Sequence, residues 1–188
     1  MNIFDLIKSR RTIRKFLQKL LSENQLMSYI DAARVAPSGA NLQPLKYIAV
    51  NSADMAEKVF PLLKWAGYLE DYAPKDGERP VAYIVVCVDK NIRPNGGELD
   101  VGASVENILL AALEEGVGTC WLASVDRDAL ADLLDVPDNL YISSVVALGY
   151  PAENPVMVEV TDDIKYYLDD KTLCVPKRSI DEIVVKIF

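Results

Sequence analysis

The spacing of apolar residues along the chain predicts a domain of mixed helices and strands. Residues 81–88 are almost wholly apolar and β-branched, which is typical of a central strand buried on both faces. Residues 100–115 place apolar side chains every three or four positions, which predicts the longest helix, ending at Gly116. Its apolar face is broad enough to be internal or to lie in a subunit interface.

Two further helices begin with recognisable caps. Ser22 and Gln25 form a capping-box pattern, so we expect a helix from there through about Val35. Asp126 is expected to cap a helix through about Leu134. The remaining pattern predicts short helices at 3–7 and 54–61, the latter bent or ended by Pro61, and strands at 45–50, 117–123 and 141–148.

The pattern changes past Gly149. Prolines predict irregular chain up to the basic pair Lys177 and Arg178. The chain then ends in an apolar tail at 180–188. Because such a tail is too apolar to stay free in water, we expect it to pack on another surface, such as that of a partner subunit.

Length and composition limit the class of protein. A chain of 188 residues with 51% hydrophobic residues suits a single domain, residues 1–188, with an ample core. No apolar run approaches the roughly 18 residues of a membrane span, and the N-terminus lacks the charge order of a signal peptide. Three scattered cysteines, Cys87, Cys120 and Cys174, suggest buried thiols in a cytoplasmic protein. Because the chain has no histidine, histidine triads and histidine metal sites are excluded, and we expect no metal.

Charge is unevenly distributed. The formal net charge of −8 disfavours nucleic acid as a partner. Six of the twenty basic residues nevertheless lie between Lys8 and Lys19, whereas residues 98–138 hold ten acids against the single base Arg127. A local anion site in an acidic protein explains this distribution better than a groove for a polyanion.

The basic segment reads SRRTIRKF over residues 9–16 and sets Arg10, Arg11 and Arg14 around Thr12. Planar, permanently charged guanidiniums beside a hydroxyl match a phosphate monoester better than a lone carboxylate would. Taken alone, such a run is more often a solvated charged surface. The loop APSGANLQP, residues 36–44, follows a helix with small and amide side chains, and the two stretches together favour an anion site.

Other cofactor motifs are absent from the sequence. No GxGxxG joins a strand to a helix and no GxxxxGK[ST] occurs, which excludes the common dinucleotide and Walker-type loops. Neighbouring carboxylates such as Glu114 and Glu115 are interpreted as solvated helix ends rather than as acid and base partners. An anion site without an evident nucleophile or base fits a cofactor that carries its own reactivity and a phosphate group.

Four motifs together resemble the FMN-dependent nitroreductase family. They are SRRTIRKF, APSGANLQP, DVGASVENILLAALEEGVGTCW and ALGYPAENP, in the family's order and spacing across nearly the whole chain. The resemblance implies an α+β fold, with a central mixed or antiparallel sheet flanked by helices, in an intertwined homodimer. It also implies FMN as cofactor and hydride transfer from NAD(P)H through flavin N5 to a small nitroaromatic, quinone or similar acceptor. This cycle requires no dedicated side-chain base, so we assign no catalytic residue.

The resemblance further implies which residues contact the flavin. They are Arg10, Arg11, Thr12 and Arg14 at the phosphate and ribityl chain, Ser38, Gly39 and Asn41 in a loop from the opposite subunit, Trp121, Leu122 and Ala123 at the strand end against the isoalloxazine, and Lys177 and Arg178 completing the phosphate site. Thr12 stands where serine is usual in the family. The phosphate contact of the last pair is assigned to either Lys177 or Arg178. Leu45 and Ala123 replace the tryptophan and the polar residue of other members, and both changes bear on the substrate rather than on the flavin.

Residues 65–80 and the choice of activity leave alternatives open. Trp65, Tyr68 and Tyr72 lie among glycines and prolines, so this segment is either a lid over a pocket, which we favour, or a packed connection. A reductive dehalogenase of the iodotyrosine type is the alternative enzyme, although Lys64 stands where its lid carries glutamate. A flavin-binding protein without catalytic turnover is the alternative outside enzymes.

Overall fold

The computed structural model describes residues 2–188 and centres on a five-stranded antiparallel sheet. Its strands are β1 (Phe16–Leu17), β2 (Leu45–Val50), β3 (Ala82–Asp89), β4 (Gly118–Leu122) and β5 (Leu140–Pro151). The order is β1-β5-β3-β2, and β4 pairs with β5 over residues 145–149. The α+β class is therefore confirmed, and the predicted strands at 45–50, 81–88, 117–123 and 141–148 are present within a few residues.

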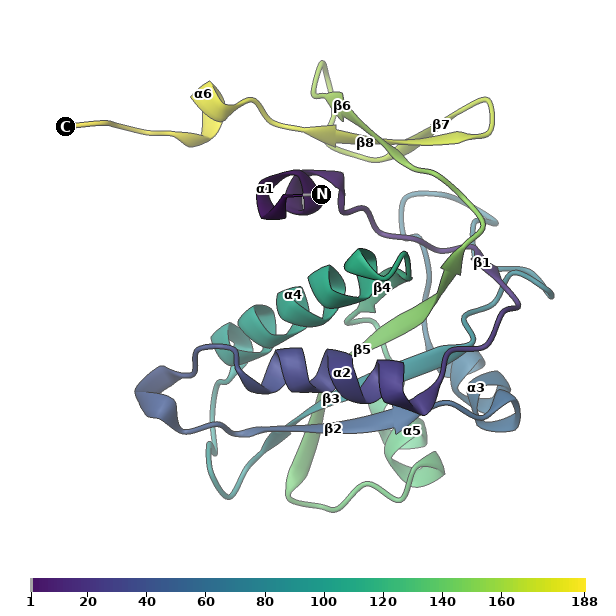
Figure 1. Ribbon diagram of the computed structural model, residues 1–188, viewed down its shortest axis with the longest axis vertical. Helices are drawn as coiled ribbons and strands as arrows, with labels where there is room; N and C mark the ends of the chain where they lie inside the picture. The colour runs from purple at the N-terminus through teal and green to yellow at the C-terminus, as the bar shows by residue number, and fades with distance from the viewer. Residues whose placement is uncertain (1) are drawn as a thin grey trace.

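Strand β3 is buried along its whole length and divides the core into two layers. Ile84 and Val86 belong to a cluster built with α2 (Glu23–Arg34) and α4 (Glu98–Glu114). Tyr83 and Val85, which alternate with them, belong to a cluster built with α3 (Ala53–Val59) and α5 (Arg127–Leu133). Because successive side chains of a strand point to opposite faces, the apolar run of β3 serves both layers. Figure 1 shows these two helix pairs on opposite faces of the sheet.

The helix ends follow local capping chemistry. The capping box of Ser22 and Gln25 is formed, and Asp126 caps α5, as predicted. Helix α4 stops just before Gly116, whose φ of 73° suits glycine. The predicted start of α3 is corrected, because the Ser52 side chain accepts the Met55 N–H and caps the helix two residues before Asp54.

The segment after β5 is more regular than predicted. Three short strands, β6 (Val156–Glu159), β7 (Tyr167–Asp169) and β8 (Thr172–Lys177), form a second sheet in the order β6-β8-β7. The β6–β8 ladder is parallel and the β7–β8 ladder is antiparallel. The expectation of irregular chain here was wrong because the outer strands are exposed, so they lack the apolar alternation that marks a strand in sequence.

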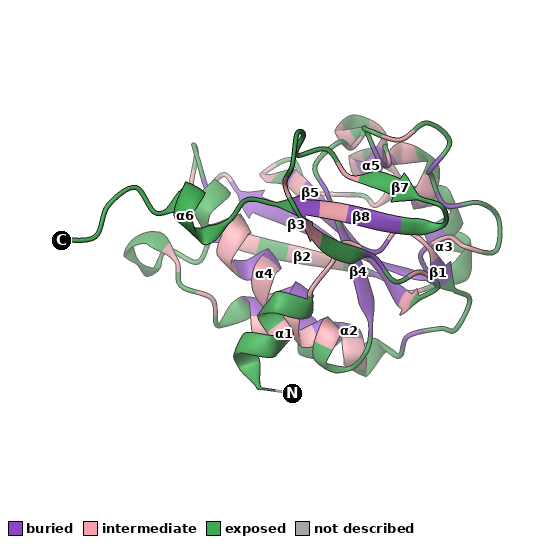
Figure 2. Ribbon diagram, turned by 90° about the horizontal axis from the view of Figure 1, so that it is seen from above, coloured by how far each residue is buried: buried purple, intermediate pink, exposed green. Residues whose placement is uncertain are grey.

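Two apolar elements remain uncovered in the single chain. Helix α1 (Ile3–Ser9) buries none of its side chains within the described residues. Helix α6 (Ile180–Ile183) and the residues after it extend from the body, and Figures 1 and 2 show this tail as an exposed arm. Phe188 at its end is fully exposed. None of the helices of residues 2–188 is long and apolar enough to span a bilayer.

Candidate functional site

The basic run at 9–15 is held against the sheet rather than free in solvent. Thr12 forms a parallel bridge with Thr119 of β4, and the Ile13 N–H donates to the Thr119 carbonyl at 2.8 Å. A Cβ at Gly118 would lie 2.8 Å from Cγ1 of Ile13, so the run approaches β4 closely only because that residue is glycine. This anchoring argues against a simple solvated charge run.

Each arginine of the run has a different environment. Nε of Arg10 lies 3.6 Å from a carboxylate oxygen of Glu106. The Arg11 guanidinium donates to the carbonyls of Lys8 and Arg10. Partial burial, and then the positive charge of Arg10, lower the pKa of Arg11. An anion beside this pair would offset both effects.

Arg14 points to a different surface of the same run. Its guanidinium lies over the Tyr166 ring, 4.6 Å from the centroid. Its Nε is buried without a hydrogen-bond partner among residues 2–188. A buried donor left unpaired is costly, so this atom marks a place where a ligand or water oxygen would be favourable.

Arg10 and Arg11 line a small cavity, called here the arginine cavity, of about 170 Å³. Its wall also includes Ser9, Ile13, Leu113, Gly116, Val117, Gly118, Thr119, Pro151, Glu153, Asn154 and Pro155. Pockets for drug-sized ligands are about 300–1,000 Å³, so this cavity suits one end of a larger ligand. Arg14 is outside its lining.

The loop at 36–44 is strained and held by a buried carboxylate. Ala40, Asn41 and Gln43 have φ of 52°, 53° and 51°, in the left-handed region that non-glycine residues rarely adopt. Asp100 of α4 accepts the Gly39 N–H at 3.0 Å. The Ser38 hydroxyl accepts the Gln43 N–H at 3.0 Å. These bonds fix the turn that carries the predicted residues Ser38, Gly39 and Asn41.

Asp100, which holds this loop, was not among the residues singled out from the sequence. It is 4% exposed, and Nη1 of Arg93 lies 2.9 Å from its Oδ2. Burial alone would raise the pKa of Asp100, but hydrogen bonds from Ser38 and Gly39 and the charge of Arg93 together hold this pKa below its usual value. An aspartate in the first turn of a helix is common because it interacts favourably with the helix dipole. Only the contacts of Asp100 reveal that it holds the 36–44 loop.

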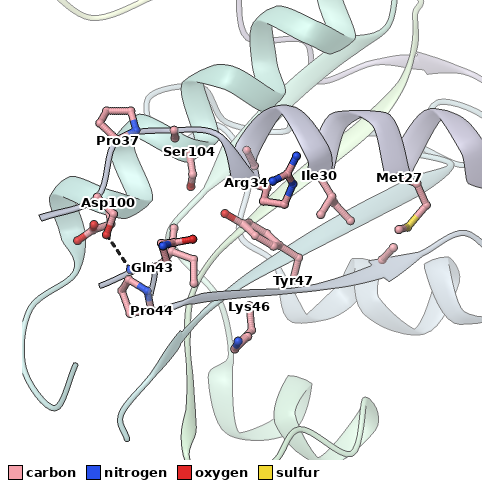
Figure 3. A pocket seen from close by; sticks show the side chains of 15 residues that line it. Met27, Ile30, Arg34, Pro37, Gln43, Pro44, Lys46, Tyr47, Asp100 and Ser104 are labelled. Atoms are coloured by element: carbon pink, nitrogen blue, oxygen red, sulfur yellow. Dashed lines mark hydrogen bonds between the residues drawn. The ribbon is translucent and has the colours of Figure 1, made fainter. Parts of the chain in front are cut away.

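A larger cavity of about 480 Å³, the loop cavity, adjoins this turn between α2, β2 and the start of α4. Figure 3 shows Tyr47 rising from β2 toward α2, with Met27 and Ile30 above it and Asp100 and Ser104 at the loop end. Its wall is mainly apolar, with Arg34 and Lys46 among its polar members.

The two cavities lie at opposite ends of α4. Asp100 and Ser104 line the loop cavity, whereas Leu113 and Gly116 line the arginine cavity. At a rise of 1.5 Å per residue, the thirteen positions from Asp100 to Leu113 span roughly 20 Å. Within one chain, the arginine run and the 36–44 loop therefore line two separate cavities.

The remaining predicted flavin contacts lie outside both cavities. Trp121 is 43% exposed and donates its ring N–H to Ser144 Oγ at 2.8 Å, Leu122 is buried, and the Ala123 carbonyl accepts from Arg127. Lys177 ends β8, and exposed Arg178 lies 3.4 Å from Glu182.

The aromatic segment at 65–72 is packed at both ends. The Trp65 ring stacks on Phe60 with centroids 5.6 Å apart, and Tyr72 is buried. Tyr68, in contrast, is 57% exposed and packs on Tyr166 at 5.0 Å. Tyr68 is thus the most exposed of the three rings of the predicted lid.

Comparison with known proteins gives a consistent result. The family model described as Nitroreductase family matches residues 7–150. An Archaeoglobus fulgidus protein, provisionally named NADH dehydrogenase/NAD(P)H nitroreductase, is 33% identical over 84% of this chain and 90% of its own length. A Thermotoga neapolitana iodotyrosine deiodinase is 25% identical over 79% of this chain and 88% of its own. A Desulfovibrio desulfuricans structure, provisionally a nitroreductase, in complex with FMN, superposes with a TM-score of 0.71 at 23% identity, covering 100% of this chain and 98% of that one.

We predict that Asp100→Asn destabilises the protein at neutral pH, because the half-buried Arg93 loses its charged partner. The free energy of unfolding in urea should fall by about 1–3 kcal/mol. Since the folded-state pKa of Asp100 is lowered, its contribution is present above the unfolded value of about 3.9 and is lost as the pH falls through the folded value. The difference from wild type should therefore shrink at pH 3.

Asp54→Asn is the matched control, because Asp54 forms an exposed ion pair with Lys58. This variant should change the unfolding free energy by less than about 1 kcal/mol. An Asp100→Asn protein as stable as wild type at pH 7, or equally destabilised at pH 3 and pH 7, would contradict the assignment.

Proposed function

Because the chain belongs to the nitroreductase family, we propose that it is an FMN-dependent oxidoreductase that transfers hydride from NAD(P)H to a small aromatic acceptor, such as a nitroaromatic or a quinone. The observation that carries the proposal is the arginine cavity, in which Arg10 and Arg11 meet beside the sheet of a protein with a net charge of −8. The FMN found in the Desulfovibrio relative supports the choice of cofactor.

The residues of the basic run fit the phosphate end of FMN. Arg10 and Arg11 would hold the phosphate, and the Thr12 hydroxyl would add a donor at the point where the run meets β4. The unpaired Nε of Arg14 offers one more buried N–H beside the run. FMN, when bound, supplies the hydride-accepting and hydride-donating position at N5. The protein then has to bind, orient and shield it.

A second copy of the chain would complete the site. Within one chain, the loop that carries Ser38, Gly39 and Asn41 borders a different cavity from the one that Arg10 and Arg11 line. Two copies related by a two-fold axis could bring the loop of one to the cavity of the other. The uncovered apolar residues of α1 and of the tail at 180–188 offer surface for such an interface. We therefore propose a homodimer with two sites.

The iodotyrosine-type alternative is less well supported. The chain resembles the Thermotoga neapolitana deiodinase at 25% identity, but Lys64 occupies the place of the glutamate expected in that lid. The backbone N–H of Lys64 donates to the Ser124 carbonyl, and the residue leads directly into the packed Trp65. A carboxylate that would bind an amino group is therefore missing at this position.

The proposed activity is tested by reconstituting the purified protein with FMN and following oxidation of NADH and of NADPH. With a quinone or nitroaromatic present, we expect steady-state oxidation of at least one of the two. A flavin-loaded protein that oxidises neither would overturn the enzyme proposal in favour of a non-catalytic flavin-binding protein.

We predict that replacing Arg10 and Arg11 together by alanine weakens FMN binding. Each charge-assisted hydrogen bond to a phosphate contributes about 1.5–3 kcal/mol, so the dissociation constant should rise by at least about a hundredfold. Quenching of flavin fluorescence measures it. Lys58→Ala, which removes an exposed cation from α3, is the control and should bind FMN normally. Unchanged flavin affinity in the double variant would remove the arginine cavity from the site.

Removal of residues 180–188 tests the proposed homodimer. We expect the full chain to sediment as a dimer at micromolar concentration and the truncated chain to shift toward monomer, because the apolar tail would no longer cover its partner. Flavin content should fall with dimer content, since each site would need both copies. A full-length, flavin-bound monomer would contradict the proposal.

A further inference from the structure

Glu153 is the residue at which three distant segments meet. Its Oε1 accepts the backbone N–H of Arg14, and that of Lys15 at 3.2 Å. Its Oε2 accepts the hydroxyl of Tyr72 at 2.6 Å. One carboxylate therefore ties the basic run to the aromatic segment at 65–72, with both of its oxygens occupied by donors.

Side-chain contacts reinforce the same connection. The two residues whose N–H groups Glu153 accepts each place a cation over a tyrosine: Arg14 lies 4.6 Å from the Tyr166 centroid and Lys15 lies 5.0 Å from that of Tyr72. Tyr166 in turn accepts the backbone N–H of Tyr68 at 3.4 Å. Cation–π pairs of this kind add to the hydrogen bonds, so the basic run and the aromatic segment form one connected unit.

Glu153 also lines the arginine cavity together with Arg10 and Arg11. Its charge opposes a phosphate, but hydrogen bonds from two backbone N–H groups and a tyrosine hydroxyl stabilise that charge and weaken the repulsion. Burial, and then the hydrogen bond to Glu153, raise the pKa of Tyr72, so the hydroxyl keeps the proton that it donates. Glu153 therefore acts on the backbone that presents the arginines rather than on the anion.

We propose that Glu153 is a positioning residue that couples anion binding by the basic run to the order of the aromatic segment at 65–72. A phosphate held by Arg10 and Arg11 restrains the run, and Glu153 passes this restraint to Tyr72. By reciprocity, docking of Tyr72 on Glu153 preorganises the cavity for the phosphate. The inference rests on the proposed FMN site. It adds that phosphate binding there determines how well ordered the segment at 65–72 is.

Tyr72→Phe tests the coupling, because it removes one hydroxyl and keeps the buried ring. Its FMN dissociation constant should rise by about 3- to 10-fold, the factor expected for one hydrogen bond. Trypsin cleavage at Lys64 and Lys75, which flank the segment, supplies a second readout independent of activity. FMN should slow this cleavage in the wild-type protein and protect Tyr72→Phe much less.

Glu153→Ala and Glu153→Gln complete the test. Alanine removes all three hydrogen bonds and should weaken FMN by more than about tenfold, whereas glutamine keeps an oxygen for the backbone N–H groups and should lie between alanine and wild type. Adding Tyr72→Phe to Glu153→Ala should cost nothing further, because the two residues act through one contact. Additive losses would overturn the coupling.

Two controls separate this contact from general damage. Tyr68→Phe makes the same chemical change at an exposed ring of the same segment, and Glu114→Gln removes a charge at the exposed end of α4. Both should bind FMN and resist trypsin as wild type does. Wild-type behaviour of Tyr72→Phe, or equal losses in Tyr68→Phe, would overturn the proposal.

The apoprotein distinguishes failure of this inference from failure of the proposed function. If the wild-type protein binds no FMN, the proposed function is wrong. The contact between Glu153 and Tyr72 is then tested by trypsin cleavage of the apoproteins. Faster cleavage of Tyr72→Phe than of Tyr68→Phe supports its role in ordering the segment at 65–72, and equal rates overturn it.

Discussion

The position of the candidate site depends on the hydrogen bonding of β5. This one strand pairs with β3 over residues 140–148, with β4 over residues 145–149, and with β1 at its last two residues. Its end leads within two residues to Glu153, which accepts N–H groups from the basic run. The strand that completes the core therefore also fixes where the arginines lie.

Close packing sets a second condition on the same place. The run passes between β4 and the end of β5, and the missing side chains of Gly118 and Gly149 leave room for Ile13 and Phe16. A Cβ at Gly149 would lie 3.0 Å from the Phe16 ring. Binding chemistry and backbone packing are thus joined, because a larger residue at either glycine would move the run that carries the arginines.

Much of the fold was predictable from sequence because its signals are local. The apolar run of β3, the helical period of α4 and the caps at Ser22 and Asp126 each depend on a few neighbouring residues. The second sheet was not predictable, because its order comes from pairing with β8, whose buried Leu173, Cys174 and Pro176 do not alternate as in a half-buried strand. Local periodicity reports burial, and these strands bury little.

The candidate site was predictable only in part, for a related reason. The motifs identified Arg10, Arg11 and Ser38 as residues of interest, but no spacing in the sequence reveals that Asp100 holds the 36–44 loop or that Glu153 joins Tyr72 to the basic run. Both carboxylates act through backbone N–H groups, and any residue but proline presents one. Their partners therefore leave no trace in composition and become visible only when the chain is folded.

The separation of the two cavities along α4 has a consequence for symmetry. In a two-fold dimer, each contact that brings the loop of one chain to the arginine cavity of the other is made twice. A change in the surface around α4 would then alter both sites together, whereas a change at Glu153 would act on the arginine cavity of each chain. In such a dimer, flavin affinity and subunit association would be linked through α4, whereas Arg10, Arg11 and Glu153 line a cavity that is formed within one chain.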